Sequence, residues 1–368
     1  MSVHMRKFSK LIDNYGRVHD YLRISLTEKC NLNCSYCMPN KYPQRNKTNL
    51  SNMMMMTSNE LLFLADYFCS RGIRKIRLTG GEPLLRSDIL QIIKSLNDLK
   101  SKHKHFTEIG MTTNGVKFKK FAENFKMAGL DSVNISLDSL KSERILKLTG
   151  QSTFKNSMAA IIKAIEVGFK NVKVNCVIMK NFNEDELCDF VKLTRYLPIE
   201  VRFIEYMPFA DNQWEISKLC SFKQMLNIVQ NSYPNLISLN EKSFDVAKLF
   251  QVSGWLGKIG FITSMTENFC AGCSRLRLTA DGNLKICLHD NYEVSLVTIL
   301  RNTINSHVIE EWMMKKSNCN LKQSSELNEI YNQLDQIIDE ALTKKSANHK
   351  GAIQLASSVN RSMVRIGG

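Results

Sequence analysis

Short apolar segments alternate with longer stretches of helical periodicity over the first 210 residues. Six segments have the apolar and β-branched character of strands: YLRISL (21–26), IRKIRLTG (73–80), EIGMTTNG (108–115), DSVNISLD (131–138), VKVNCVIM (172–179) and VRFIEYMP (201–208). Amphipathic stretches typical of helices lie between them, at 58–72, 87–99, 118–129, 154–168 and 184–197. Strands that alternate with helices predict a parallel sheet with right-handed crossovers.

Six strand–helix units make about three quarters of an eightfold barrel. The pattern therefore predicts an α/β fold with an incomplete (β/α)6 TIM-type barrel that is open on one side. We divide the chain into an N-terminal arm (1–20), a partial barrel (21–210) and a less regular C-terminal region (211–368). Sites in barrel folds gather where strands end, and each distinctive motif of this chain follows a predicted strand.

The first such motif is CNLNCSYC, which places Cys30, Cys34 and Cys37 in a C-x3-C-x2-C pattern. Structural zinc sites and clusters that only carry electrons both take four ligands. Three thiolates instead leave one iron of a four-iron cluster open, and an open iron indicates chemistry. The alternative is a zinc knuckle with its fourth ligand elsewhere in the chain.

A second group of cysteines lies in the C-terminal region. Cys270 and Cys273 are followed by Cys287, again with no obvious fourth cysteine. His289 stands two residues further on, so a Cys3His zinc site is the alternative here. Two groups of three cysteines in one chain favour a second open cluster, whose free iron is able to bind a substrate.

Basic residues interrupt strands that should be apolar if both faces are buried. Four of the six strands carry one, at Arg23, Arg77, Lys173 and Arg202. A buried unpaired charge costs on the order of several kcal/mol, so each must meet an anion. We expect some of them to pair with Glu205 or Asp138.

Two more cations, Arg275 and Arg277, directly follow the second cysteine pair. Alternate positions of an extended segment put both side chains on one side. Six converging cations suit a triphosphate, which arginine binds through paired hydrogen bonds.

Composition narrows the function further. The chain has 368 residues, a net charge of +15 and 43% hydrophobic residues. The charge is not clustered with aromatic residues, so it favours a small anionic substrate over nucleic acid. No apolar run reaches 18 residues, and the basic N-terminus lacks a secretory signal, so we expect no membrane span. Eleven cysteines, six of them clustered, predict ligands in a reducing compartment.

The first cysteine motif, with Tyr36 before its last cysteine, resembles the signature of the radical S-adenosylmethionine (SAM) superfamily. The resemblance implies that Cys30, Cys34 and Cys37 hold a [4Fe–4S] cluster whose open iron binds SAM, which is split to a 5′-deoxyadenosyl radical. The segment Thr79-Gly80-Gly81-Glu82-Pro83 is similar to the superfamily segment that holds the SAM amino group. The resemblance to the superfamily further implies SAM contacts at Tyr36, Gly81, Ser136 and Met207.

Nearly the whole chain resembles one family, the GTP 3′,8-cyclases of molybdenum cofactor biosynthesis. The likeness rests on YLRISLTEKCNLNCSYCMP, KIRLTGGEPLLR, MTTNG, VNISLDSL, NVKVNCVIM, VRFIEYMP, the second cysteine block with its RLR, and the terminal Gly-Gly. It implies that Cys270, Cys273 and Cys287 hold an auxiliary [4Fe–4S] cluster that binds guanine. It also implies GTP contacts at Arg23, Arg77, Thr112, Lys173, Arg275 and Arg277. Gly367 and Gly368 resemble a catalytic tail, with Arg202 as the neighbour.

The family resemblance implies conversion of GTP to 3′,8-cyclo-7,8-dihydro-GTP, with two [4Fe–4S] clusters and SAM as cofactors. Expected partners are a reductant of the flavodoxin or ferredoxin type and a downstream cyclic pyranopterin monophosphate synthase. A monomer or homodimer is expected in the cytoplasm, or in the mitochondrial matrix of a eukaryote. Two alternatives stay open: a peptide-modifying radical SAM enzyme, which usually has more C-terminal cysteines, and a non-catalytic metal sensor.

Overall fold

The computed structural model describes residues 9–37, 55–210, 212–239, 246–303, 312, 325–358 and 360–367. Its centre is one sheet of 12 strands, in the order β12-β11-β10-β1-β2-β3-β4-β5-β6-β9-β8-β7. The strands are β1 (Tyr21–Ser25), β2 (Lys75–Thr79), β3 (Glu108–Thr113), β4 (Ser132–Ser136), β5 (Asn171–Ile178), β6 (Ile199–Glu205), β7 (Leu236–Ser238), β8 (Lys248–Val252), β9 (Lys258–Ile262), β10 (Arg275–Leu278), β11 (Asn283–Lys285) and β12 (Glu293–Ser295).

The six predicted strands are present as β1 to β6, all parallel and side by side in chain order. Two further parallel strands flank them, because β10 pairs with β1 and β9 pairs with β6. The region beyond residue 210, which we expected to be less regular, thus extends the same sheet at both edges. Its strands have 3 to 5 residues and pair mostly as antiparallel hairpins, so the strand–helix pattern is absent from them.

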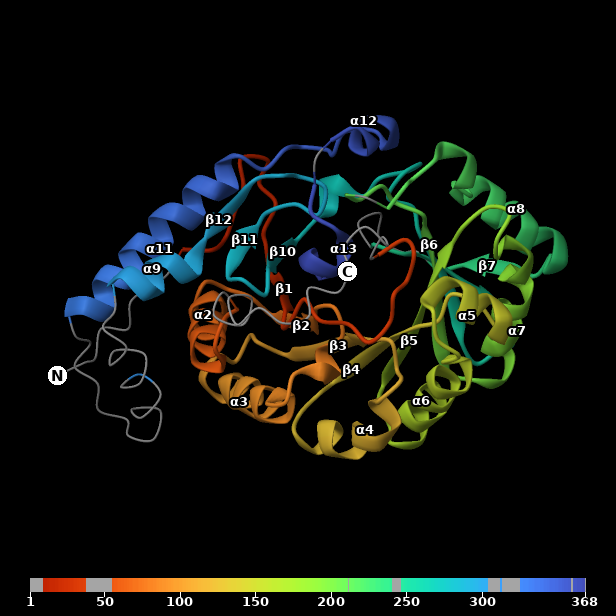
Figure 1. Ribbon diagram of the computed structural model, residues 1–368, viewed down its shortest axis with the longest axis horizontal. Coiled ribbons are helices and arrows are strands. Elements are labelled where there is room, and N and C mark those ends of the chain that lie inside the picture. Colours follow the sequence, from red (N-terminus) through yellow and green to blue (C-terminus); the bar gives the residue numbers. More distant parts are fainter. Residues whose placement is uncertain are drawn as a thin grey trace.

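Helices cover the outer side of the curved sheet (Figure 1). The α-helices are α2 (Ser58–Ser70), α3 (Ile89–Lys102), α4 (Phe118–Met127), α5 (Ser142–Thr149), α6 (Phe154–Glu166), α7 (Leu187–Tyr196), α8 (Phe222–Ser232), α9 (Leu296–Thr303), α11 (Ser325–Thr343), α12 (Ala352–Ala356) and α13 (Met363–Ile366). Helix α13, near the C-terminus, lies within the curve of the sheet, whereas α9 and α11 lie beyond its β12 edge (Figure 1). No helix among the described residues is long and apolar enough to cross a membrane.

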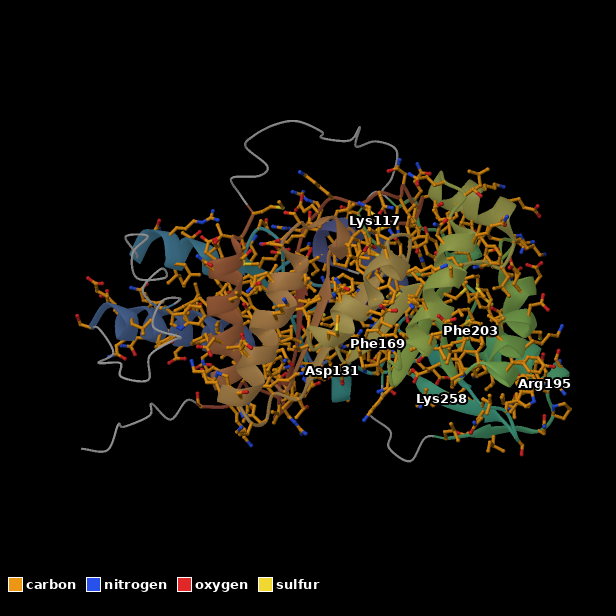
Figure 2. All side chains as sticks on the ribbon, turned by 90° about the horizontal axis from the view of Figure 1, so that it is seen from below. Lys117, Asp131, Phe169, Arg195, Phe203 and Lys258 are labelled. Carbon is orange, nitrogen blue, oxygen red and sulfur yellow. The ribbon has the colours of Figure 1, made fainter. Side chains whose placement is uncertain are left out.

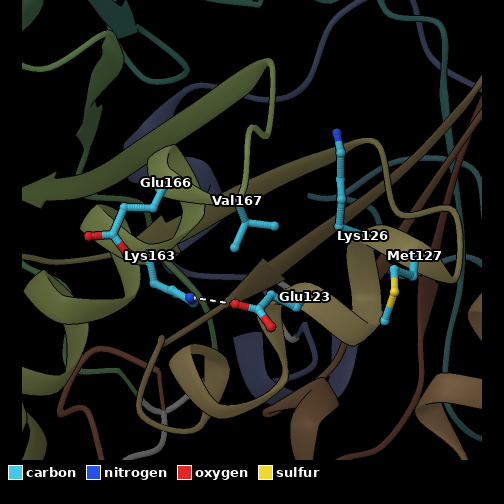
Figure 3. A pocket seen from close by; sticks show the side chains of 6 residues that line it. All are labelled: Glu123, Lys126, Met127, Lys163, Glu166 and Val167. Carbon is cyan, nitrogen blue, oxygen red and sulfur yellow. Dashed lines mark hydrogen bonds and ion pairs between the residues drawn. The ribbon is translucent and has the colours of Figure 1, made fainter.

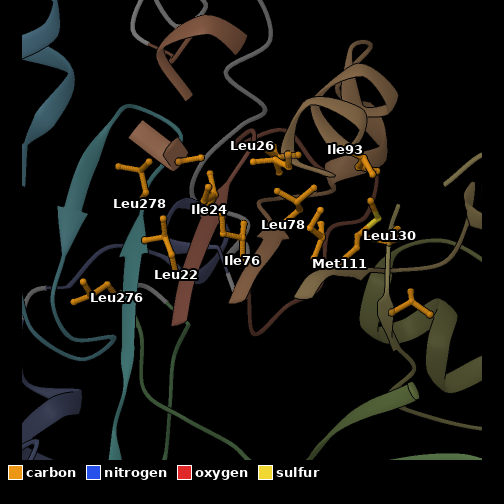
Figure 4. Packing of buried hydrophobic residues seen from close by; sticks show 14 of the residues in the cluster. Leu22, Ile24, Leu26, Ile76, Leu78, Ile93, Met111, Leu130, Leu276 and Leu278 are labelled. Atoms are coloured by element: carbon orange, nitrogen blue, oxygen red, sulfur yellow. The ribbon is translucent and has the colours of Figure 1, made fainter. Parts of the chain in front are cut away.

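The hydrophobic core lies between the sheet and these helices. Leu22 and Ile24 of β1 are fully buried, as are Ile76 and Leu78 of β2 (Figure 4). Because strand side chains alternate between faces, the residues between these apolar positions point to the inner side. That period of two places apolar residues against the helices and polar residues inside the curve.

The parallel strands give the sheet two different ends. Lys117 follows β3 at one end, whereas Asp131, which precedes β4, and Lys258, which begins β9, lie toward the other (Figure 2). The motifs singled out in the sequence follow the carboxyl ends of the strands, so this end of the sheet is where the predicted sites lie.

Candidate active site

A cavity of about 530 Å³ lies inside the curve of the sheet. Inward side chains of the strands line it, together with the loops after β9 and β11. It brings together the six cations predicted to converge, which are Arg23, Arg77, Lys173, Arg202, Arg275 and Arg277. It also brings in the three C-terminal cysteines, which are Cys270, Cys273 and Cys287.

Three of the arginines form a row across neighbouring strands. The parallel register puts Arg23 opposite Arg277 of β10 on one side and opposite Arg77 of β2 on the other. Burial, with the charge of Arg77, lowers the pKa of Arg23 to about 10. Burial and the charge of Arg23 hold the pKa of Arg277 well below its usual value. Adjacent like charges disfavour one another, so the row favours binding of an anion.

The two carboxylates expected to pair with these cations have other partners. Glu205 accepts hydrogen bonds from main-chain N–H groups, including that of Met265 at 2.7 Å. Asp138 accepts from the Tyr36 hydroxyl at 2.8 Å and from the Val177 N–H at 2.8 Å. The expected pairing is therefore wrong, because backbone donors already satisfy these carboxylates.

Two carboxylates that the sequence did not single out, Glu108 and Glu200, pair with the cavity cations instead. Glu200 forms an ion pair with Arg202 and lies 3.6 Å from the Lys173 ammonium. Glu108 lies 2.6 Å from the Lys75 ammonium and 3.6 Å from the Arg77 guanidinium. These anions hold the cations of β2, β5 and β6 in place.

Tyr21 and Lys75 also line the cavity and were missed. Each stands two residues before a predicted cation, Arg23 or Arg77, so the same period of two would have found them. The Arg77 guanidinium donates to the Tyr21 hydroxyl over 2.6 Å. Although burial alone would raise the pKa of Tyr21, the charges of Arg77 and Arg23 lower it to about 7.

Two polar groups of the strand interiors lack a protein partner within the described part of the chain. They are the Thr112 hydroxyl and the Asn175 side-chain oxygen, and both are buried. Thr112, a predicted GTP contact, does not itself line the cavity; it lies opposite Asn134, which does. Buried polar groups without partners are rare in native proteins, so the oxygen of Asn175, which lines the cavity, suits a hydrogen bond to a ligand.

The first cysteine loop follows β1 at the carboxyl end of the sheet. Cys30, Cys34 and Cys37 are each partly exposed. Burial and the charge of Cys37 raise the pKa of Cys34 well above its usual value, and Cys30 adds to that effect. The three thiols therefore lie close enough to act on one another, as ligands of a shared cluster must.

The Gly80-Gly81-Glu82 segment is joined to the stem of this loop. The Gly81 N–H donates to the Thr27 carbonyl at 2.7 Å, and the Glu82 N–H donates to the Lys29 carbonyl at 2.8 Å. A Cβ on Gly81 would lie 2.3 Å from the Lys29 oxygen. Close packing under the cysteine loop thus requires glycine here, which is a structural reason that the sequence did not reveal.

Glu82 is buried at the base of the same segment. It accepts from the Thr113 hydroxyl at 2.7 Å and from the main-chain N–H groups of Asn114 and Leu84. Burial raises its pKa to about 6. These bonds connect the ends of β2 and β3 beneath the loop.

Of the four residues that the resemblance assigns to SAM, only Met207 lines the cavity. Tyr36 packs against the small buried cluster that includes Tyr206 and donates to Asp138, and Ser136 ends β4. Tyr36, Gly81 and Ser136 thus follow or end strands at the carboxyl end of the sheet, apart from the cations.

The second cysteine group occupies the short helix η4 (Cys270–Gly272) and the strand ends beside it. Burial raises the pKa of Cys270. Burial acts in the same direction on Cys273, but Arg275 and Lys345 outweigh it and lower that pKa to about 7. The three thiols again act on one another, which fits a shared cluster.

His289, the fourth ligand of the zinc alternative, stacks on Phe209 with ring centroids 6.0 Å apart. Within the described ranges, no three His, Cys, Asp or Glu side chains converge closely enough to hold one metal ion. The ligands of a four-iron cluster each bind a different iron and stand further apart. The geometry of these side chains therefore does not support the zinc alternative.

The C-terminal tail enters the same space. The Arg277 guanidinium donates to the Gly367 carbonyl over 2.9 Å. Gly367 has a φ of +78°, and a Cβ there would lie 2.5 Å from the Thr79 hydroxyl oxygen. Arg202, the expected neighbour of the tail, is ion-paired with Glu200. Gly368 lies outside the described residues.

A second hollow, of about 360 Å³, lies between α4 and α6 on the outer side (Figure 3). Lys163 and Glu123 pair across it over 2.6 Å. It includes none of the predicted site residues, so the inner cavity is the candidate active site.

Comparison with known proteins identifies the class first. Residues 24–194 match the Radical SAM superfamily, and residues 199–320 match Molybdenum Cofactor Synthesis C. The crystal structure of Streptococcus suis SuiB bound to S-adenosylmethionine shares the fold, with a TM-score of 0.58 and 14% identity over 91% of this chain and 79% of that one.

Closer relatives identify the family. The chain is 42% identical to the Arabidopsis thaliana GTP 3′,8-cyclase, mitochondrial, over 97% of this chain and 83% of the relative. It is 38% identical to the GTP 3′,8-cyclase of Syntrophomonas wolfei, over 83% and 92%. The chain belongs to the GTP 3′,8-cyclase family. It is also 44% identical to molybdenum cofactor biosynthesis protein 1 of Mus musculus, over 99% of this chain but 52% of that protein, so it spans about half the length of such relatives.

Proposed function

We propose that this chain converts GTP to 3′,8-cyclo-7,8-dihydro-GTP, the first step of molybdenum cofactor biosynthesis. One observation carries the proposal: a single cavity is lined by both the six cations and the three C-terminal cysteines. The family match supports the same reaction.

The first three cysteines, Cys30, Cys34 and Cys37, would hold a [4Fe–4S] cluster with SAM on its open iron. When bound, this pair supplies the 5′-deoxyadenosyl radical that removes hydrogen from the ribose. Tyr36, Gly81, Ser136 and Met207 would contact SAM from the strand ends. The curved parallel sheet around them would be the incomplete (β/α)6 barrel, with residues 1–20 as an arm and 211–368 as the auxiliary region.

Cys270, Cys273 and Cys287 would hold a second [4Fe–4S] cluster at the cavity wall. The mutual effect of the three thiols and their common position on the cavity support this assignment. The three cysteines would leave one iron without a protein ligand, and that iron would be able to accept a ring nitrogen of the guanine base.

The arginine row would bind the triphosphate. Arg23, Arg77 and Arg277 lie side by side and present planar donors that match phosphate oxygens. Lys173 and Arg275 would extend this site, and Thr112 would donate from its unpartnered hydroxyl. A phosphate bound to these three arginines would relieve the repulsion between them. Because the folded chain already holds the arginines side by side, no further rearrangement would be needed to bind the anion.

The tail residues Gly367 and Gly368 would help to close the cavity and act in turnover, with Arg202 as their neighbour. Arg277, which donates to the Gly367 carbonyl, supports this role. Exclusion of water protects a radical from side reactions. A reductant of the flavodoxin or ferredoxin type and a downstream cyclic pyranopterin monophosphate synthase would be the partners. The protein would act as a monomer or homodimer, in the cytoplasm or, in a eukaryote, in the mitochondrial matrix.

The test is an anaerobic incubation of cluster-reconstituted protein with GTP, SAM and dithionite, followed by mass spectrometry. We expect a product isomeric with GTP that forms in step with 5′-deoxyadenosine. If 5′-deoxyadenosine forms without a GTP-derived product, the assignment as a radical SAM enzyme would stand, but GTP would be rejected as the substrate. With both clusters intact, the absence of both products would indicate a sensor.

A further inference from the structure

A short segment after α11, residues 345–349, runs alongside the second cysteine group. The Lys345 ammonium donates to the carbonyls of Arg275, at 3.2 Å, and of Ile286, and it reaches the Cys273 sulfur over 3.9 Å. The Lys345 ammonium therefore links this segment directly to one of the three cysteines.

Arg17 of the N-terminal arm fixes the segment from its other side. Its guanidinium donates to the carbonyls of Ala347 and Cys270, each at 2.9 Å, and to that of Ser346 at 2.8 Å. Asp13 pairs with the same guanidinium over 2.6 Å. Lys345 thus has a fixed position relative to the cysteines.

Lys345 is an unusual buried charge. Its side chain is almost fully enclosed, at 4% exposure for the residue. Within the described part of the chain, its polar contacts are the two carbonyls and the Cys273 sulfur, and no carboxylate pairs with it. A buried ammonium needs an anion nearby. The cysteine that Lys345 reaches, Cys273, would supply that charge when it ligates a cluster, because the thiolate is the form that binds metal.

We propose that Lys345 sets the reduction potential of the auxiliary cluster, an inference that rests on the proposed function. One-electron reduction adds a negative charge to the cluster, while no bond forms or breaks. A fixed cation at a ligand sulfur stabilises the reduced form and so raises the midpoint potential. Lys345 acts through Cys273 and is a positioning residue that does not itself touch the substrate.

Two neighbouring lysines provide a matched comparison. Lys344 precedes Lys345, but its ammonium pairs with Glu340 at the surface, over 2.9 Å. Lys345→Gln keeps an N–H donor and removes the charge, Lys345→Arg keeps the charge, and Lys344→Gln removes an equal charge from the surface. Each is made in the full chain with Cys30, Cys34 and Cys37 replaced by Ala, so that only the auxiliary cluster is titrated.

Dye-mediated potentiometry with dithionite, followed by electron paramagnetic resonance, measures the midpoint. In Lys345→Gln we expect the reduction equilibrium constant to fall at least tenfold, which is 59 mV for one electron. Lys345→Arg and Lys344→Gln should stay within a factor of three of the parent. If only Lys345→Gln loses the cluster while Lys345→Arg keeps the parent midpoint, the cluster requires the positive charge at position 345, as the inference states.

Two results would overturn the inference. One is a Lys345→Gln midpoint equal to that of Lys344→Gln. The other is loss of the cluster from both Lys345 variants, which would make Lys345 only a structural support of the loop. Iron analysis of the parent separates these results from a failure of the proposed function, since a parent without an auxiliary cluster would reject the function itself.

Discussion

The Arg277 guanidinium donates a hydrogen bond to the Gly367 carbonyl over 2.9 Å, although 90 residues separate the two in the sequence. Arg277 belongs to the arginine row, and Gly367 packs on the ends of β1 and β2. One side chain therefore joins the proposed triphosphate site to the tail. Substrate binding and tail position are expected to depend on each other.

Replacement of Gly367 by Ala should separate radical formation from cyclisation. The new Cβ would lie 2.5 Å from the Thr79 oxygen, so the tail must move away. We expect cyclised product to fall at least tenfold while 5′-deoxyadenosine still forms. Gly254→Ala is the control, because Gly254 has a similar φ of +81° but nothing within 4 Å. Full cyclisation by Gly367→Ala would mean that the tail has no role.

Arg23→Met should stabilise the protein without ligand while it weakens GTP binding. Arg23 lies between Arg77 and Arg277 in the row, and their mutual repulsion is removed. We expect the thermal midpoint to rise by about 2 °C or more and GTP affinity to fall at least tenfold. Calorimetry and equilibrium binding measure both. The surface variant Arg74→Met should change neither, and a lower midpoint for Arg23→Met would show that Arg23 is structural.

Gly81→Ala should disturb the first cluster and leave the second intact. Its Cβ would lie 2.3 Å from the main-chain oxygen of Lys29. Because this is a backbone atom, the clash is relieved only if the loop itself moves. We expect iron content to fall by about half and SAM cleavage to be lost. Gly351→Ala, at a position with nothing within 4 Å, should keep both. Normal iron and SAM cleavage in Gly81→Ala would contradict this reading of the contact.

Asp138→Asn should change how stability depends on pH. Burial raises the pKa of Asp138 to about 6 from 3.8, so the native state holds this proton more tightly than the unfolded state. Stability of the parent should then fall as pH rises from about 4 to about 6. Asparagine keeps both hydrogen bonds, because its oxygen accepts from Val177 and its amide donates to Tyr36.

Urea unfolding of cluster-free protein between pH 4.5 and pH 7 measures the difference. We expect the advantage of Asp138→Asn to grow to roughly 1–3 kcal/mol by pH 7. Asp185→Asn should differ from the parent by a constant amount over this range, because Arg144 lowers the pKa of Asp185 to about 2. A constant difference for Asp138→Asn as well would rule out the predicted titration.

Local patterns predicted the six central strands and the cations on them. Arg275 and Arg277 were expected on one side of an extended segment, and both do line the cavity. The parallel pairing of β9 and β10 with the central strands was not expected, because their partners, β6 and β1, are set by the three-dimensional fold and not by a neighbouring helix. The anions Glu108 and Glu200 were missed for the same reason.

The glycine motif illustrates the opposite case. Gly81 was expected only as a SAM contact, because nothing in its own segment indicates which backbone packs against it. The structure places the Lys29 carbonyl there. A contact between segments more than 50 residues apart leaves no local trace in either one.

Arg17 and Ala347 are 330 positions apart, yet they are directly joined beside Cys270. The ribosome synthesises the chain from the N-terminus, so the partner of Arg17 is made only after almost the whole chain. The first cysteine loop has main-chain anchors much earlier in the chain, because the N–H groups of Asn33 and Ser35 donate to the carbonyls of Thr149 and Leu148 in α5. The proposed auxiliary site is therefore completed only after almost the whole chain has been synthesised.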